Sequence, residues 1–274
     1  MPAKNKPLHP QFSPFDQVAE HYDIAFSESP VGLLQRERVH QFLSAAVSGK
    51  SLNILEMNCG TGQDAIWLAE KGHQVTATDA SGRMVEVVIG KIKNRSLELQ
   101  IEALQISFKG IKRQFPPSSY DLIFSDFGGL NCIPKDELQL LLDDAASLLK
   151  PHGKFIAVIM GRKCLWERSY FLLKGKPGDA FRRNKVEPVK ATIGNEIQQT
   201  WYYSPKEVAA LSSANFKTNK IRPVGIAIPP SYLNPFFIQR KILLSALNKL
   251  ERMFSISIFS NYADHFYIEL QKDK

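Results

Sequence analysis

From Asn53 to about Met160, short apolar runs alternate with amphipathic stretches. This alternation is typical of βαβ units, in which each apolar run forms a buried strand and a helix leads to the next parallel strand. The sequence therefore predicts a doubly wound α/β core. The expected strands are Leu52–Glu56, Gln74–Thr78, Leu97–Ala103, Tyr120–Ser125 and Gly153–Met160, and the expected helices lie near Gln63–Lys71, Ser81–Lys91 and Lys135–Leu149.

The segment before this core has helical signals. Ser13-Pro14 is a typical helix start, and a second helix is expected near Leu33–Ala46. We therefore expect residues 1–50 to form a helical N-terminal cap on a domain that spans residues 51–274.

Beyond Met160 the pattern changes again. Gly194-Asn195 predicts a two-residue hairpin turn, and a capping box that begins at Ser204 predicts a helix to about Ala214. A strand near Thr218–Val224, a helix over Phe236–Phe254 and a final strand in "DHFYIEL" are expected after it. Residues 162–203 and 225–260 are interpreted as elaborations over the sheet on the substrate side.

Composition is that of an ordinary globular chain of 274 residues. No apolar run approaches the roughly 18 residues of a membrane span, and Met1–Pro10 does not have the pattern of a signal peptide, so a cytoplasmic protein is expected. Cys59, Cys132 and Cys164 are too far apart for a zinc motif and too few for a disulfide framework. We expect free thiols and no metal site.

The formal net charge of +8 is concentrated in one segment. Between Lys150 and Lys190 there are 11 lysines and arginines against three acids. Such a segment fits a solvated charged face, a site for an anionic group, or peripheral contact with an anionic membrane. Nucleic acid is a further partner for a basic segment, and the sequence leaves the first three interpretations open.

The glycines Gly60 and Gly62 follow the first predicted strand in the pattern Gly-x-Gly-x-x-Ala. In an open parallel sheet, ligands bind past the carboxyl ends of the strands, and glycines there allow a sharp turn and close approach of the backbone. Dinucleotide-binding loops have the same spacing, so the glycines do not by themselves identify the ligand.

Two acids around the turn discriminate between ligands. Glu56 precedes Gly60 by four residues, where its charge would repel a pyrophosphate by about 1–4 kcal/mol at contact and would attract an ammonium or sulfonium group. Asp79 ends the second strand, where a carboxylate can accept hydrogen bonds from both ribose hydroxyls. The pair favours S-adenosylmethionine over NAD, and an NAD-dependent oxidoreductase remains an alternative.

Four motifs in order resemble those of class I S-adenosylmethionine-dependent methyltransferases of the small-molecule, quinone-methyltransferase-like kind. They are "ILEMNCGTG", "VTATDAS", "YDLIFSDFGGLNCI" and "ASLLKPHGKFIAVIM", and "FDQVAEHYD" resembles the helical cap of that family. The resemblance implies a Rossmann-like seven-stranded sheet, mostly parallel, with helices on both faces and an antiparallel seventh strand in "ADHFYIEL". Asn58 is a departure, because the family more often has glycine at that position.

The resemblance also implies a set of cofactor-binding residues. The methionine moiety would be held by Glu56 and by the backbone of Asn58, Cys59, Gly60, Thr61 and Gly62, and the ribose by Asp79. The adenine would be flanked by Ala80, Met84 and Leu104. Asp126 and Phe127 would border the methyl group, and Tyr22 would close over the cofactor. For Met84, Leu104, Phe127 and Tyr22 an ordinary packing role stays open.

The implied reaction converts S-adenosylmethionine to S-adenosyl-L-homocysteine. Methyl transfer is an in-line displacement that needs alignment more than a general base, and the sequence does not identify a base; the candidates are Asp126, His21, Tyr202 and His265. We expect the acceptor to be a small molecule that is bulky and partly apolar or anionic, and we expect it to bind beneath a lid that carries Trp201. A non-catalytic S-adenosylmethionine-binding relative remains an alternative.

A nucleic-acid methyltransferase is a further alternative, and it is disfavoured. The segment "SDFGGL" lacks the Asn/Asp-Pro-Pro-aromatic sequence that is frequent among amino-group-directed enzymes of that kind. The oligomeric state and the methylated atom stay open.

Overall fold

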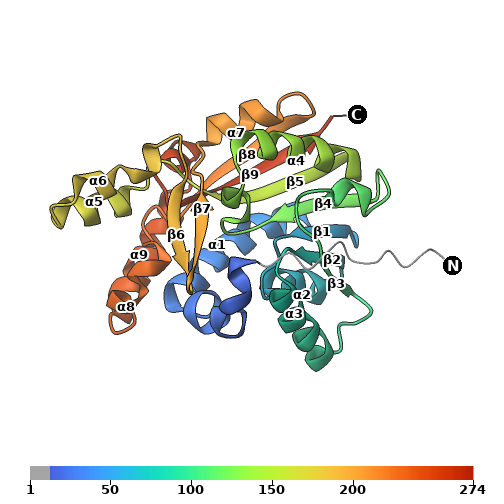
Figure 1. Cartoon of the computed structure of the whole chain (residues 1–274), viewed down its shortest axis with the longest axis horizontal. Coiled ribbons are helices and arrows are strands. Elements are labelled where there is room, and N and C mark those ends of the chain that lie inside the picture. The colour runs from blue at the N-terminus through green and yellow to red at the C-terminus, as the bar shows by residue number, and fades with distance from the viewer. Residues whose placement is uncertain (1–12, 274) are drawn as a thin grey trace.

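The computed structural model describes residues 13–273, so Met1–Pro10 lies outside the described residues. A seven-stranded sheet runs through the molecule with helices on both faces (Figure 1). The strands are β1 (Asn53–Met57), β2 (Gln74–Asp79), β3 (Ile101–Gln105), β4 (Tyr120–Ser125), β5 (Leu149–Met160), β8 (Phe216–Val224) and β9 (His265–Lys272).

The strand order is β3-β2-β1-β4-β5-β9-β8. Neighbours from β3 to β5 pair in parallel, and β9 is antiparallel to both β5 and β8. The predicted fold class, including its antiparallel seventh strand, is confirmed.

Both faces of the sheet are apolar, because successive residues of a strand point to opposite sides. Leu55 and Ile123 pack on the face covered by α4 (Lys135–Leu148) and α7 (Pro205–Ser212). Ile54 and Phe124 pack on the other face. That face is covered by α1 (Pro30–Ala46), α2 (Gln63–Glu70) and α3 (Gly82–Arg95).

One predicted strand is displaced along the chain. The expected strand Leu97–Ala103 is observed as β3, Ile101–Gln105. Residues 96–100 form a turn instead, because α3 continues to Arg95 and the Leu97 N–H donates to the Ile92 carbonyl at 3.1 Å. The strand therefore extends two residues farther toward the ligand-binding edge than predicted.

The chain before β1 is helical, as expected of a cap. It comprises two 3₁₀ turns, η1 (Pro14–Gln17) and η2 (Ala19–His21), a π-helical turn, η3 (Asp23–Ser27), and α1. Ser29 caps α1 by accepting a hydrogen bond from the Gly32 N–H at 3.1 Å. The division into a cap and a domain at residue 50 stays a prediction.

After β5 the chain forms the predicted hairpin and several short helices. The hairpin pairs β6 (Val189–Ile193) with β7 (Glu196–Thr200) as a separate two-stranded sheet. The short helices after β5 are α5 (Leu165–Leu173), α6 (Pro177–Ala180), α8 (Asn234–Phe237) and α9 (Lys241–Met253). Three 3₁₀ turns also follow β5, namely η6 (Arg182–Asn184), η7 (Ser231–Leu233) and η8 (Ser257–Asn261). Two further 3₁₀ turns, η4 (Ile111–Arg113) and η5 (Gly129–Cys132), precede β5.

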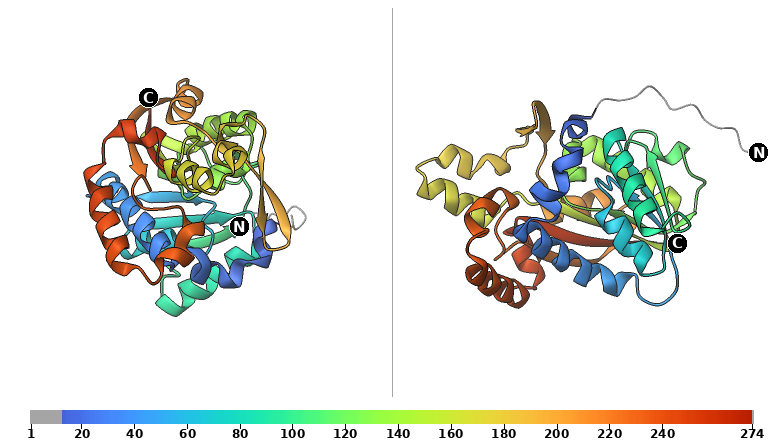
Figure 2. Two further views of the ribbon diagram at one scale, coloured as in Figure 1. Left: turned by 90° about the vertical axis from the view of Figure 1, so that its left-hand side faces the viewer. Right: turned by 90° about the horizontal axis from the view of Figure 1, so that it is seen from below.

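The single helix predicted over Phe236–Phe254 is two helices, α8 and α9. The break falls at Arg240, whose backbone is not helical (φ −115°, ψ 51°). The α5–α6 and α8–α9 segments project from the same end of the molecule (Figures 1 and 2). Within residues 13–273, every helix is too short or too polar to cross a bilayer.

Candidate functional site

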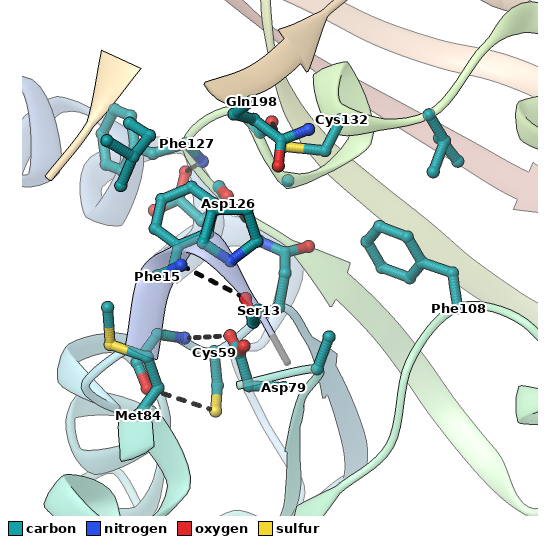
Figure 3. A pocket seen from close by; sticks show the side chains of 18 of the residues that line it. Ser13, Phe15, Cys59, Asp79, Met84, Phe108, Asp126, Phe127, Cys132 and Gln198 are labelled. Carbon is teal, nitrogen blue, oxygen red and sulfur yellow. Dashed lines mark hydrogen bonds between the residues drawn. The ribbon is translucent and has the colours of Figure 1, made fainter. Parts of the chain in front are cut away.

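A cavity of about 790 Å³ lies past the carboxyl ends of the parallel strands. The turn after β1, the end of β2 and the loop after β4 form its floor, and η1 and the β6–β7 hairpin contribute to its wall. Figure 3 shows Cys59, Asp79, Met84, Asp126 and Phe127 around this space. The cavity is at the edge of the sheet where the sequence predicts a ligand site.

The turn after β1 depends on left-handed backbone conformations. Gly60 and Gly62 have φ of 53° and 77°, and Asn58 has φ of 51°. A Cβ at Gly62 would lie 2.9 Å from the Val88 side chain, so α3 packs where only glycine leaves room. The sequence therefore specifies the turn through both conformation and space.

Asn58 ties this turn to the loop after β4. Its side-chain Nδ2 donates to the Asp126 carbonyl at 2.7 Å, and its Oδ1 accepts from Ser125 Oγ at 2.6 Å. A Cβ at Gly129 would come within 2.1 Å of the Asn58 side chain, so Gly129 leaves the space that Asn58 occupies. Asparagine tolerates the left-handed region better than most residues, which explains how it replaces the usual glycine.

Asp79 fixes the other side of the turn. Its carboxylate accepts hydrogen bonds from the Gly60 N–H at 2.9 Å and the Ser81 N–H at 2.8 Å. Burial raises the pKa of Asp79 although these hydrogen bonds oppose the shift. Because each carboxylate oxygen has two lone pairs, both can accept a further hydrogen from a ligand in the cavity.

Three carboxylates gather below the turn around one arginine. Glu56 at the end of β1 is 1% exposed, and Asp64 and Asp126 are also buried. Arg36 of α1 pairs with Asp64 and lies 3.7 Å from the Asp126 carboxylate, and His40 Nε2 lies 2.6 Å from Asp64 Oδ1. The cluster contains more acidic than basic groups.

The pKa values of these acids diverge. Burial alone would raise the pKa of Asp64, but Arg36 and His40 outweigh burial and hold this pKa below its usual range. Burial, and then the charge of Asp64, raise the pKa values of Glu56 and Asp126 well above the ordinary value. Arg36 therefore compensates Asp64 more fully than it compensates the other two.

Two oxygens in this cluster lack hydrogen-bond partners. Among the described residues, none forms a hydrogen bond with Glu56 Oε2 or with Asp126 Oδ2, although both atoms are buried. Buried carboxylate oxygens that accept no hydrogen bond are costly. Their position beside a ligand cavity fits a ligand that brings positive charge, as the ammonium and sulfonium groups of S-adenosylmethionine do.

Most of the predicted site residues meet at the cavity. The residues that line it are Tyr22, Asn58, Cys59, Gly60, Thr61, Asp79, Ala80, Met84, Asp126, Phe127 and the candidate base Tyr202. Glu56 and Gly62 are adjacent to the lining residues, in the cluster and the turn described above. Their individual roles stay predictions.

Besides Glu56 and Gly62, three further predicted residues do not line the cavity. Leu104 does not, because β3 is displaced; Ile106, whose N–H donates to the Asp79 carbonyl at 2.9 Å, lines the wall with Phe108 instead. His21 is exposed on η2. His265 is buried behind Phe127, with the two rings perpendicular and their centroids 5.3 Å apart.

Sequence analysis missed Arg36 and Asp64, which come from α1 and from the first turn of α2. One signal was available, because Arg36 has polar neighbours Gln35 and Arg38 that are buried on a helix otherwise anchored by apolar residues. Long polar side chains on the buried side of a helix require partners. Which partners they find depends on tertiary contacts.

Three features together define the fold of class I S-adenosylmethionine-dependent methyltransferases. They are the order of the strands, the glycine turn after β1 and the acids at the ends of β1 and β2. Residues 54–153 match the family model described as "Methyltransferase domain". This match spans about a third of the chain, and S-adenosylmethionine, the cofactor predicted from the sequence, is the cofactor of that class.

The ubiquinone/menaquinone biosynthesis C-methyltransferase UbiE of Zymomonas mobilis is 30% identical over 145 residues. The match covers 53% of this chain and 57% of that relative, so it spans little more than half of the relative's length.

Two solved structures share the fold. A protein of Pyrococcus horikoshii is 15% identical with a TM-score of 0.60, over 93% of this chain and 99% of that chain. The geranyl diphosphate C-methyltransferase of Streptomyces coelicolor, in complex with S-adenosyl-L-homocysteine, is 11% identical with a TM-score of 0.54, over 86% and 76% of the two chains.

Proposed function

We propose that this chain transfers a methyl group from S-adenosylmethionine to a small-molecule acceptor that is bulky and largely apolar. The observation that carries the proposal is the pair of buried oxygens of Glu56 and Asp126 that accept no hydrogen bond beside the glycine turn. A cationic cofactor would satisfy both, whereas a pyrophosphate would add like charge to an acidic cluster.

The cofactor seat follows from the geometry of the turn. Glu56 and Asp126 would accept the ammonium group and lie near the sulfonium, and Asp79 would accept the ribose hydroxyls. Met84 and Ile106 line the cavity beyond Asp79 and would enclose the adenine. When bound, S-adenosylmethionine supplies the electrophilic methyl group.

The rest of the cavity is available to the acceptor and is mostly uncharged. Its wall includes Phe108, Cys132, Ile133, Met160, Ile193 and Trp201. Apolar and aromatic walls exclude water and align an apolar acceptor for in-line attack. The names of two relatives, one for C-methylation of geranyl diphosphate and one for ubiquinone and menaquinone biosynthesis, support an acceptor with an apolar part.

The arginines of the basic segment do not provide an anion site in the cavity. Arg182 and Arg183 both donate to the Glu167 carboxylate, and Arg183 also pairs with Asp264 at 2.8 Å. None of these residues lines the cavity. We therefore omit an anionic group from the proposed acceptor.

Of the candidate bases, Asp126 and Tyr202 line the cavity. Burial raises the pKa of Tyr202, so its phenol stays protonated at neutral pH and can donate a hydrogen bond to the acceptor. Asp126 is the one carboxylate among the candidate bases, which makes it the group suited to accept a proton where the acceptor must lose one. A cytoplasmic location stays a prediction.

Calorimetric titration with S-adenosyl-L-homocysteine and with NAD tests the cofactor. We expect binding of the first alone, weakened by Asp79→Asn and unchanged by Glu86→Gln, an exposed acid on α3 that serves as the control. Binding of NAD alone would contradict the cofactor assignment.

Production of S-adenosyl-L-homocysteine from prenylated and unprenylated phenols tests the acceptor. We expect turnover of the prenylated compounds. Tight cofactor binding without turnover of any apolar acceptor would instead support a non-catalytic relative.

A further inference from the structure

Helix α9 exposes its apolar residues to solvent. Ile242, Ala246, Leu250 and Met253 recur at helical spacing and lie on one face of the helix. Ile242 is 90% exposed and Met253 is 72% exposed. The opposite face carries Leu244, which packs against Val31 and Phe237. One side of the helix thus packs against the protein, while none of the described residues covers its other apolar face.

The uncovered surface continues beyond the helix. Phe254, Ile256 and Ile258 follow α9, and each is also exposed. We use "the α9 apolar face" for the exposed residues of this surface, which are Ile242, Leu243, Ala246, Leu250, Met253, Phe254, Ile256 and Ile258. Single exposed apolar residues are ordinary on protein surfaces, but eight exposed apolar residues within residues 242–258 are typical of an interaction site.

The surroundings of this face are basic. Residues 231–263 contain four basic residues and a single acid, Glu251. Glu251 points inward, where its carboxylate accepts from the N–H groups of Gly225, Ala227 and Ile228 at 2.7–3.1 Å. Arg252 pairs with Glu37 of α1 at 3.1 Å, whereas Lys241 and Lys249 form no ion pair within residues 13–273, so the charges of these two lysines are uncompensated.

The neighbouring α5–α6 segment has the same character. It projects from the same end of the molecule (Figure 2), and it exposes Leu172 and Leu173 beside Lys174 and Lys176. Two exposed apolar and basic segments at one end of the molecule fit one extended, negatively charged and apolar partner.

We propose that the α9 apolar face docks on the surface of a lipid bilayer that contains anionic lipids. An amphipathic helix with an apolar face and flanking lysines lies in the plane of such a surface, with its apolar side chains at the boundary of the acyl chains. Anionic head groups attract the flanking lysines. The helix does not cross the bilayer, and the proposal does not depend on the reaction that the cavity supports.

A second copy of the chain is a poorer occupant. A two-fold contact through this face would bring the same lysines and arginines of both copies together. Like charges across an interface oppose association, whereas an anionic bilayer offers charges of opposite sign over the same area.

Sedimentation of the full chain with phosphatidylcholine vesicles, with and without phosphatidylglycerol, tests the proposal. We expect binding to the anionic vesicles, and binding should fall as salt is added. Ile242→Gln with Met253→Gln should lower the partition coefficient at least about tenfold, because two apolar side chains no longer leave water. Lys241→Gln and Lys249→Gln should each lower it about fivefold.

Leu99→Gln is the matched control, because Leu99 is 87% exposed and precedes β3, at the opposite edge of the sheet from β8. This variant should bind vesicles as the unmodified chain does. Thermal melting of each variant establishes that it is folded.

Three results would overturn the proposal. One is absence of binding to the anionic vesicles, and another is equal loss of binding in the control variant. The third is a dimer in light scattering that Ile242→Gln with Met253→Gln converts to a monomer, since the face would then join two copies of the chain.

Discussion

At the scale of single residues, Glu56 has an unfavourable environment for an ionised carboxylate. Burial and the charges of Asp64 and Asp126 all raise its pKa, and Arg36 only partly offsets them. A residue with a raised pKa in the folded protein destabilises the fold once pH exceeds its unfolded value, because ionisation is easier in the unfolded chain. Such a residue is explained more readily by ligand binding than by stability.

Glu56→Gln should therefore raise the melting temperature of the cofactor-free protein at neutral pH. The same variant should weaken binding of S-adenosyl-L-homocysteine by about 1.5–3 kcal/mol, roughly ten- to hundredfold, because a charged hydrogen bond to the ammonium group is lost. Thermal melting and calorimetry measure the two effects. Glu70→Gln, an exposed acid on α2, is the control, and a lower melting temperature with unchanged affinity would refute the assignment.

Cofactor affinity should depend on pH through Glu56 and Asp126. Their pKa values are raised in the free protein, so protons occupy them at pH values where ordinary carboxyls are ionised. A bound cation favours the ionised forms, so binding should release protons and strengthen as pH rises through the raised pKa values. Calorimetry in buffers of different ionisation enthalpy counts the protons, and uptake of protons on binding would have the wrong sign.

Asn58 combines a left-handed backbone with two side-chain hydrogen bonds. Asn58→Ala loses both bonds and keeps the backbone strain, so we expect it to lower the free energy of unfolding by roughly 2–3 kcal/mol. Asn58→Gly loses the same bonds without the strain and should be about 1 kcal/mol more stable than the alanine variant. Urea unfolding compares the two, and equal stabilities would exclude a contribution from the backbone.

At the scale of elements, the β6–β7 hairpin forms a lid over the cavity. Its base is held by Asn131, which donates to the Trp201 carbonyl at 2.6 Å. Its tip contacts η1, where the Asn195 N–H donates to the Gln17 side chain at 3.1 Å. The cap and the hairpin, almost 180 residues apart in the sequence, thus meet at the wall of the cavity.

Gln17→Ala should loosen the tip of this hairpin while leaving its base in place. We expect faster amide exchange over residues 189–200 and faster release of S-adenosyl-L-homocysteine, with exchange in the central sheet unchanged. Hydrogen exchange and stopped-flow dissociation measure these effects. Gln199→Ala, at an exposed position of the same hairpin, should behave as the parent; acceleration in both variants would indicate general loosening instead.

At the scale of the whole molecule, a buried ion-pair network joins the sheet to the segments after β5. Arg183 donates to Glu167 of α5, to Asp264 beside β9, and to the Gly161 carbonyl. Removal of Arg183 would leave the buried carboxylates of Glu167 and Asp264 without their positive partner. Arg183→Ala should therefore lower the free energy of unfolding by about 3–5 kcal/mol. Arg182→Ala, at a more exposed position, should cost about 1 kcal/mol or less. Urea denaturation measures both, and comparable losses would contradict the ranking.

The sequence was informative where local chemistry decides the structure. Strand β4 begins and ends as predicted at Tyr120–Ser125, and the Gly194-Asn195 turn forms the predicted hairpin. The periodicity of the apolar residues and the conformational freedom of glycine are local properties. The number and order of the motifs were sufficient to predict the topology of the sheet.

Other features depend on contacts between distant residues, which periodicity does not report. The start of β3 depends on how α3 ends, and this displacement moved the cavity wall from Leu104 to Ile106. Likewise, the approach of Arg36 to Asp64 and Asp126 requires α1 to lie beneath the turn. The uncovered face of α9 lies in residues 225–260, which the sequence led us to interpret as an elaboration on the substrate side, because an amphipathic pattern identifies an apolar side without identifying its partner.

The position of β9 in the sheet affects the order in which the chain can fold. This strand is made after β8 but lies between β5 and β8, so β8 has no partner in the sheet until β9 is present. A chain leaving the ribosome can pair β1 to β5 early, while β8 must wait for some forty further residues. The late contacts also place His265 behind Phe127 and Asp264 against Arg183, so the cavity acquires its final support only when synthesis has passed β9.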